Sequence, residues 1–202
     1  MSARRRLAPE QRRLLLVEAG ARLFGERPYD AVLMEDVAAA AGVSRALLYR
    51  HFPTKRELFA AVYEQASADL LVATELDADS PFAEQLAAGL DAHFDYFESN
   101  AHSVIAANRV LATDPTIQAI ISGELGELRL RLLDVLGVEG QLREATSAVL
   151  MSWLTYVRVL TIDWLENHSL TREQMRQVSV GALLGALEAL LGPGRFPPSA
   201  AG

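Results

Sequence analysis

Apolar residues recur at helical spacing along most of the chain, and this pattern predicts an all-α protein of about nine helices. In the first segment, Leu16, Ala19, Leu23 and Phe24 share one face of a helix that begins near Pro9. Gly, Pro and turn-forming residues interrupt the periodicity between segments. The expected helices are 9–24, 34–41, 45–51, 54–73, 81–99, 102–111, 116–136, 141–167 and 171–191.

Two short helices near the N-terminus form a helix-turn-helix pattern: "MEDVAAAA", the turn "GVS" and "RALLYRH". Gly42 is suited to the left-handed conformation that ends the first helix, and Ser44 is a good N-cap for the second. The small side chains of Ala39 and Ala40 are expected to let the two helices cross closely. The expected inward positions are Val37, Ala41, Val43 and Leu48, and the expected outward positions are Arg45, Ala46, Tyr49 and Arg50.

The outward face of the second helix has the chemistry of a major-groove reader. Arginine can bond guanine through two hydrogen bonds, and alanine can contact a thymine methyl group. Polar residues on either side can reach phosphates. The residues predicted to bind DNA are Ser44, Arg45, Ala46, Leu47, Tyr49, Arg50, His51 and Lys55.

Lys55 is the only lysine of the chain, and it stands at the predicted start of a helix. A cation is mildly unfavourable there because the helix N-terminus carries partial positive charge. A DNA phosphate bound by the lysine and by the first amides of the helix would offset this conflict. An exposed lysine without a role is the alternative.

Charge is unevenly distributed along the chain, whose net charge is −7. Residues 1–60 carry +4 and residues 61–202 carry −11. A basic N-terminal segment favours contact with a polyanion, although chance asymmetry in a short segment is the alternative. The arginines at 4–6 could enter a minor groove or form a solvated tail.

Other function classes find little support in the sequence. The chain has no cysteine, which excludes disulfides, thiolate zinc sites and cysteine nucleophiles. No zinc-protease, hydrolase, phosphate-loop or dinucleotide motif occurs, so we expect no enzymatic activity and no cofactor. The late apolar stretch "VSVGALLGALEALLG" is too short to span a membrane and contains Glu188. We therefore expect a soluble, cytoplasmic protein.

Residues 14–62 resemble the N-terminal domain of the TetR family of transcriptional regulators. The resemblance rests on several linked positions: "RLF" closing the first helix, the "G..YDA" turn, "DVA..AGVS", "LY.HF" and "K.EL". It implies a three-helix DNA-binding domain at 1–55 and a helical ligand-binding and dimerisation domain at 56–192. It also implies a regulator, and family habit favours a repressor. The Pro- and Gly-rich composition of the last residues predicts a disordered tail at 193–202.

The sequence departs from the family pattern at two positions. Leu33 stands where a Thr or Ser usually caps the second helix and touches a phosphate, so one cap and one DNA contact are in doubt. Leu47 replaces a common Thr and could contact a thymine methyl group or pack inward. The acidic residues Glu35 and Asp36 could hold Arg45 or Arg50.

A palindromic DNA operator calls for a two-fold dimer with one reading helix per half-site. The last two helices are the best candidates for the contact, because Gly181 and Gly185 form a small-xxx-small pair. Glycine inside a helix costs stability, which suggests close helix approach, either within the subunit or across the dimer. The resemblance favours the dimer.

The remaining helices are expected to hold a small hydrophobic or amphipathic effector. Polar and aromatic residues share their apolar faces: His93, Tyr96, Phe97, His102, Asn108, Arg109, Trp153, Tyr156, Val157 and Arg158. From these, the predicted ligand-binding residues are Tyr96, Asn108, Arg109, Trp153, Tyr156 and Val157. Ordinary core packing is the alternative for each of them. The arginines could instead bind a carboxylate or an acyl-CoA phosphate.

The resemblance implies a mechanism in which the ligand shifts the fourth helix and changes the separation of the two DNA-binding domains. The main alternative is a DNA-binding protein without an effector. A solid body without a cavity would favour that alternative, and a lined cavity would count against it.

Overall fold

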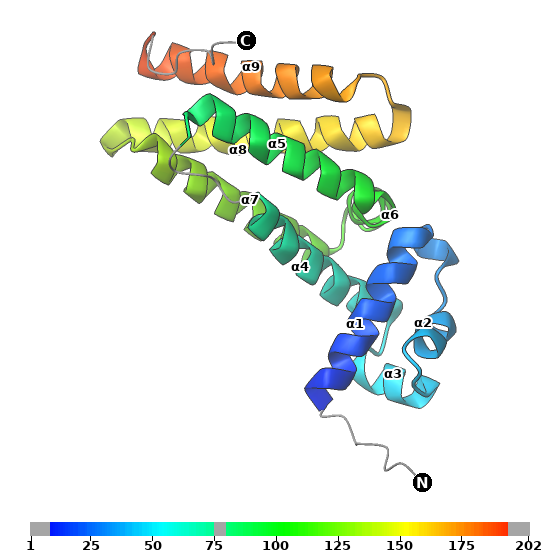
Figure 1. Cartoon of the computed structure of the whole chain (residues 1–202). Coiled ribbons are helices and arrows are strands. Elements are labelled where there is room, and N and C mark those ends of the chain that lie inside the picture. Colours follow the sequence, from blue (N-terminus) through cyan, green and yellow to red (C-terminus); the bar gives the residue numbers. More distant parts are fainter. Residues whose placement is uncertain (1–8, 75–79, 194–202) are drawn as a thin grey trace. The chain divides into compact units, whose positions relative to one another are not determined.

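The computed structural model describes residues 9–74 and 80–193, and all of its regular elements in these ranges are helical (Figure 1). The all-α prediction is therefore confirmed for the described chain. The predicted tail from 194 onward and the arginines at 4–6 lie outside the described residues. In chain order the elements are α1 (Pro9–Glu26), η1 (Tyr29–Ala31), α2 (Met34–Ala40), α3 (Arg45–His51), α4 (Lys55–Ala73), α5 (Phe82–Ser99), α6 (Ala101–Ile105), η2 (Ala106–Val110), α7 (Pro115–Leu136), α8 (Gly140–Asn167) and α9 (Arg172–Leu191).

The chain folds into two compact units that share two helices. The first unit takes the chain up to Ala66 together with Asn100–Gln118. The second takes Ser67–Ser99 and the chain from Ala119 onward. Helices α4 and α7 therefore each contribute residues to both units.

The core of the first unit brings α1 against the first half of α4. Gly20 makes this approach possible, because a Cβ atom there would lie 3.1 Å from Cγ2 of Val62. One turn further along α1, Phe24 packs edge to face against Phe59 of α4, with ring centroids 5.1 Å apart. Tyr29 of η1 joins them by stacking on Phe24. This aromatic cluster fixes the segment that leads into α2.

The second unit is a bundle in which α9 packs against α8 and α5 (Figure 1). Arg172 and Arg176 of α9 form ion pairs with Asp91 of α5, at 3.8 Å and 3.3 Å. The buried apolar core is Leu86, Leu90, Phe94, Leu132, Leu133, Leu136, Val138, Leu150, Trp153, Leu154, Val157, Trp164, Met175, Leu183 and Leu187. The core thus draws residues from four helices that are distant in sequence.

The expected helix 102–111 is two elements in the structure. The α-helix α6 ends at Ile105, and the π-helical η2 continues to Val110. Leu111 N donates to Ala106 O at 2.9 Å, which is a hydrogen bond across five residues. Short π-helical segments of this kind are rare and occur often at functional sites. Periodicity did not distinguish such a segment from an α-helix.

Helix α8, with 28 residues, is the one described helix long and apolar enough to cross a membrane by length and composition. Its inward side is part of the second unit's core, which includes Leu150, Trp153 and Val157. Core helices of water-soluble proteins commonly have this composition.

Candidate functional site

The α2–turn–α3 segment is held by a few buried residues and two local caps. Val37 and Leu48 are fully buried, one on each helix. Gly42 has a φ of 65°, the left-handed conformation expected of it. Ser44 caps α3, because its Oγ accepts a hydrogen bond from Leu47 N at 3.2 Å. Both turn predictions are confirmed.

One detail of the predicted helix crossing is wrong. Ala39 and Ala40 are exposed, and Ala38 is the buried alanine of α2. Val43 N donates to Ala38 O at 3.0 Å, so the turn closes on this residue. Of the other expected inward positions, Ala41 and Val43 are half-buried.

The outer side of α3 is exposed, as expected for a surface that reads DNA. Arg45, Ala46, Tyr49 and Arg50 are all exposed, while Leu47 is half-buried. Because Leu48 is fully buried, the helix cannot rotate these residues inward without losing its own packing. The exposed set offers two guanidinium groups, one phenol and one methyl group in a helix of 7 residues.

Acidic residues of α2 hold arginines near this surface. Glu35 forms an ion pair with Arg45, and Asp36 pairs with Arg27 at 3.2 Å. Of the two arginines that the sequence offered as partners, Arg45 and Arg50, the structure thus pairs Arg45 with Glu35. Leu33 is the N-cap of α2 and makes no side-chain cap hydrogen bond. The loss of that cap, inferred from the sequence, is confirmed.

Lys55 has partners inside the protein. Its Nζ donates to Tyr29 O at 2.9 Å and to Val32 O at 3.1 Å, and it lies 4.4 Å from the centroid of the Tyr29 ring. The first turn of α4 thus holds the segment that precedes α2. An ammonium group has three donors, and the two carbonyls take two of them. A phosphate contact by Lys55 stays a prediction.

The first turn of α4 also carries two features that the sequence analysis missed. Thr54 and Glu57 form a reciprocal capping box, with hydrogen bonds of 3.2 Å and 3.1 Å to each other's backbone N–H groups. The spacing Thr-x-x-Glu is a readable signal for it. Arg56 pairs with the buried Asp114 at 3.0 Å, and Asp114 accepts from the N–H groups of Thr116 and Ile117 at the start of α7.

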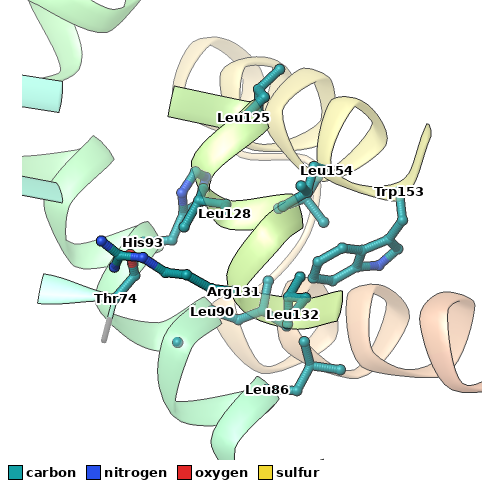
Figure 2. A pocket seen from close by; sticks show the side chains of 12 residues that line it. Thr74, Leu86, Leu90, His93, Leu125, Leu128, Arg131, Leu132, Trp153 and Leu154 are labelled. Atoms are coloured by element: carbon teal, nitrogen blue, oxygen red, sulfur yellow. The ribbon is translucent and has the colours of Figure 1, made fainter. Parts of the chain in front are cut away.

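The second unit contains a cavity of about 60 Å³ (Figure 2). Its lining comes from the end of α4 and from α5, α7 and α8, and consists of Thr74, Leu86, Gly89, Leu90, His93, Leu125, Leu128, Arg131, Leu132, Trp153, Leu154 and Val157. Figure 2 shows His93, Arg131 and Thr74 on one side of it, and Trp153, Leu154 and Leu86 on the other. The cavity therefore has a polar side and an apolar side.

The polar side rests on a buried network. His93 is only 9% exposed, and its ring lies 4.0 Å from that of Phe97, centroid to centroid. The guanidinium of Arg158 lies over the Phe97 ring, 5.4 Å from its centroid, and donates a hydrogen bond to Glu124 at 2.8 Å. Burial, and then the Arg158 charge, lower the pKa of His93 to about 3. The imidazole is therefore uncharged at neutral pH.

Comparisons with known proteins agree with this architecture. The family model described as bacterial regulatory proteins, tetR family, matches residues 16–62. The transcriptional activator FasR of Mycolicibacterium smegmatis is 34% identical over 118 residues, which are 56% of this chain and 53% of FasR. A tetR-family transcriptional regulator from Streptomyces coelicolor superposes with a TM-score of 0.81 at 26% identity, covering 91% of this chain and 84% of its own. The predicted resemblance of the N-terminal segment to the TetR family is confirmed by the match over residues 16–62.

The chain spans about half the length of the first two curated relatives it matches, 53% and 49%. The second of these is the Tn10 TetC protein of Escherichia coli, which is 28% identical over 98 residues. The family model and FasR describe transcriptional regulators rather than enzymes, in agreement with the sequence expectation.

The cavity of the second unit includes two of the six predicted ligand-binding residues, Trp153 and Val157. Tyr156 lies instead on the exposed side of α8, and Tyr96 is half-buried on α5. Asn108 and Arg109 belong to η2 of the first unit, where Asn108 Nδ2 donates to Val104 O at 2.8 Å. The structure thus does not bring the six residues together. His93 lies on one of the mixed faces but was not among the six predicted residues, and no sequence signal indicated Arg131.

The α8 and α9 surface of the second unit is open and largely apolar. A shallow hollow there is lined by Ala148, Val149, Ser152, Trp153, Tyr156, Ala182 and Ala186. Gly181 and Gly185 are exposed beside it, and a Cβ atom on either would meet no other atom within 4 Å. The two glycines therefore do not serve close packing inside the described subunit.

The buried His93 predicts acid sensitivity of the fold. Its pKa is lowered in the native state, so between pH 6.5 and about 3 the unfolded chain binds a proton that the folded chain does not. Stability therefore falls as pH falls, by up to about 1.4 kcal/mol per pH unit from this residue, or about 2 kcal/mol between pH 6.5 and pH 5. Urea unfolding of wild type and His93→Phe at both pH values should show the smaller loss in the variant. Equal losses in both would contradict the assignment.

Proposed function

We propose that this chain is a ligand-responsive transcriptional regulator that binds a palindromic DNA site as a homodimer. The observation that carries the proposal is the exposed row Arg45, Ala46, Tyr49 and Arg50 on an α3 helix anchored by the buried Leu48. Members of the family bind DNA, typically as dimers and with effectors. Within this account Ser44, Leu47, His51 and Lys55 keep their predicted contacts with DNA, and transcription control places the protein in the cytoplasm.

DNA binding is tested most directly at Arg50. We expect Arg50→Ala to weaken binding to a selected operator by roughly 5- to 150-fold, as for loss of one paired arginine–guanine contact. Arg22→Ala removes the same charge from an exposed position of α1 and serves as the matched control, with less than about 3-fold effect expected from lost long-range attraction. Fluorescence anisotropy at one fixed salt concentration measures both. Equal effects of the two substitutions would remove the reading role of α3.

Helix α4 is the element that we propose connects ligand to DNA. In the second unit Thr74, which directly follows the helix, lines the cavity, and Leu71 O in the last turn accepts a hydrogen bond from Arg131. In the first unit its first turn holds the backbone before α2 through Lys55. A ligand that displaces the cavity wall would change the position of this helix, and coupling of the two sites would be reciprocal.

Helix α7 offers a parallel connection. Leu125, Leu128 and Arg131 line the cavity, while Asp114 at its other end pairs with Arg56 of α4. The start of α7 is therefore linked to the first turn of α4 by the Arg56–Asp114 ion pair. The lined cavity counts against the alternative of a DNA-binding protein without an effector.

Dimerisation is proposed to use the exposed surface of α8 and α9. Gly181 and Gly185 have no close-packing role within the described subunit. Of the two roles predicted from the sequence, this leaves contact across a dimer interface. The direction of control stays a prediction: the sequence resemblance favours repression, whereas FasR is named an activator. Transcription from the operator with and without the protein decides between the two.

A further inference from the structure

Most polar groups that line the cavity already have hydrogen-bond partners within the protein, and one does not. Trp153 Nε1 donates to Ser179 O at 2.8 Å, and Thr74 Oγ1 donates to Leu70 O at 2.8 Å. Arg131 donates to Glu127 at 3.2 Å and to Leu71 O. His93 Nε2 is buried and has no hydrogen-bond partner among the described residues. One lining atom is therefore available to a ligand in the cavity wall.

The His93 ring is held in place by its neighbours. Phe97 packs against it at 4.0 Å, and Phe94 meets it edge on at 5.9 Å between centroids. A buried polar atom without a partner costs free energy, and a ligand group that bonds to it recovers that cost. A ring fixed in this way requires little ordering when the bond forms, which favours binding.

The charges around the cavity are already compensated. Arg131 pairs with Glu127 on the same helix, and Arg158 behind His93 pairs with the buried Glu124. His93 itself is uncharged at neutral pH. An ionic ligand would therefore find no unpaired opposite charge in the apolar cavity, and burial of its charge would be unfavourable. An uncharged polar group meets no such penalty at His93.

The cavity is also small relative to a typical ligand site. Its volume is about 60 Å³, whereas sites for drug-sized ligands span roughly 300–1,000 Å³. Any ligand longer than a few atoms must therefore push apart the leucines of α5, α7 and α8. A flexible aliphatic chain suits this requirement, because leucine-lined walls can re-form around it.

We propose that the cavity binds an uncharged, mainly aliphatic molecule with one hydroxyl or carbonyl group, whose oxygen hydrogen-bonds to His93 Nε2. The proposal rests on the proposed function, since it specifies the effector of the regulator. It assigns His93 as the residue that selects the ligand and the leucine walls as the site of its chain.

Trp153 provides the readout, because it lines the cavity and the chain has only one other tryptophan. In a Trp164→Phe background, its fluorescence is titrated with four probes of equal chain length: 1-octanol, 2-octanone, octanoate and octylammonium. We expect the first two to bind, and the two ions to bind at least about 10-fold more weakly because burial of a charge is disfavoured.

Variants then test the role of His93. His93→Leu should weaken 1-octanol binding by about 5-fold, the effect of one lost neutral hydrogen bond, and His93→Gln should restore most of it. His102→Leu is the matched control, because His102 is exposed and lies in the first unit. Circular dichroism confirms that each variant is folded.

Three results would overturn the proposal: octanoate or octylammonium binding as tightly as 1-octanol, His93→Leu binding 1-octanol like the wild type, or no probe binding at all. DNA affinity measured without probes is independent of each of them, so the DNA-binding part of the proposed function stands or falls separately. Probes that bind as expected but leave DNA affinity unchanged would support the ligand class and contradict ligand-responsive control.

Discussion

Replacing Glu124 with leucine is expected to lower the free energy of unfolding by about 3–5 kcal/mol, the usual cost of removing one partner of a buried ion pair. The side chains of Glu124 and Arg158 are 3% and 5% exposed, and their hydrogen bond is 2.8 Å long. Arginine keeps its proton inside proteins, so the substitution leaves a buried positive charge without its carboxylate. Urea denaturation monitored by circular dichroism measures the loss.

A double variant separates the charge effect from the loss of packing. Glu124→Leu combined with Arg158→Met removes both charges and should recover most of the stability, since apolar replacements of buried pairs are often neutral or stabilising. The exposed pair Arg143–Asp134 is the control, and Asp134→Asn should change stability by less than about 1 kcal/mol. A double variant no more stable than Glu124→Leu alone would show that the ion pair is not the cause.

This pair matters for function as well as for stability. Arg158 lies over Phe97, and Phe97 packs against His93, so the pair supports the polar side of the cavity. The charge of Arg158 is, after burial, the second cause that lowers the pKa of His93. Burial, with a smaller contribution from the Arg158 charge behind the cavity wall, thus keeps the His93 imidazole uncharged.

Local signals explain why the helices and the α2–α3 turn were predictable. Gly42, Ser44 and Pro115 act on their immediate neighbours, so their effects can be read from a few residues of sequence. The burial of Leu48 follows from its spacing to Val37 across a turn of fixed geometry. Most of the reading surface was therefore derivable from the sequence.

The cavity could not be derived in the same way. Glu124 and Arg158 are 34 residues apart, and their contact depends on how α7 packs against α8. Helical spacing shows that Tyr96 and Tyr156 lie on mixed faces, but it does not show which neighbour each face meets. Of the six residues chosen from mixed faces, Trp153 and Val157 line the cavity and Tyr156 is exposed. Tyr96 is half-buried, and the remaining two lie in the other unit.

Lys55 shows how a correct local argument can miss its partner. The conflict between a lysine and a helix N-terminus is real, and it predicted a nearby source of negative potential. The structure supplies it from the carbonyls of Tyr29 and Val32, which are 26 and 23 residues away in sequence. No local pattern around residue 55 identifies those two atoms.

Gly185→Glu is expected to convert the proposed dimer into monomers and to weaken operator binding by at least about 100-fold, the advantage of two linked half-sites over one. A two-fold interface places the same region of both subunits together, so one substitution introduces two like charges into an apolar contact. The fold itself should tolerate the change, because a Cβ atom at Gly185 meets nothing within 4 Å in the subunit. Sedimentation velocity and fluorescence anisotropy measure the two effects.

Gly123→Glu provides a matched control for this prediction. Gly123 also lies in a helix, α7, is exposed and has open space around its Cβ direction. The substitution adds the same charge and the same side chain, so it corrects for altered helix propensity and net charge. Dimeric Gly185→Glu protein would exclude this face as the interface. Monomers that still bind the operator with wild-type affinity would instead separate dimerisation from DNA recognition, since each α3 helix would then suffice alone.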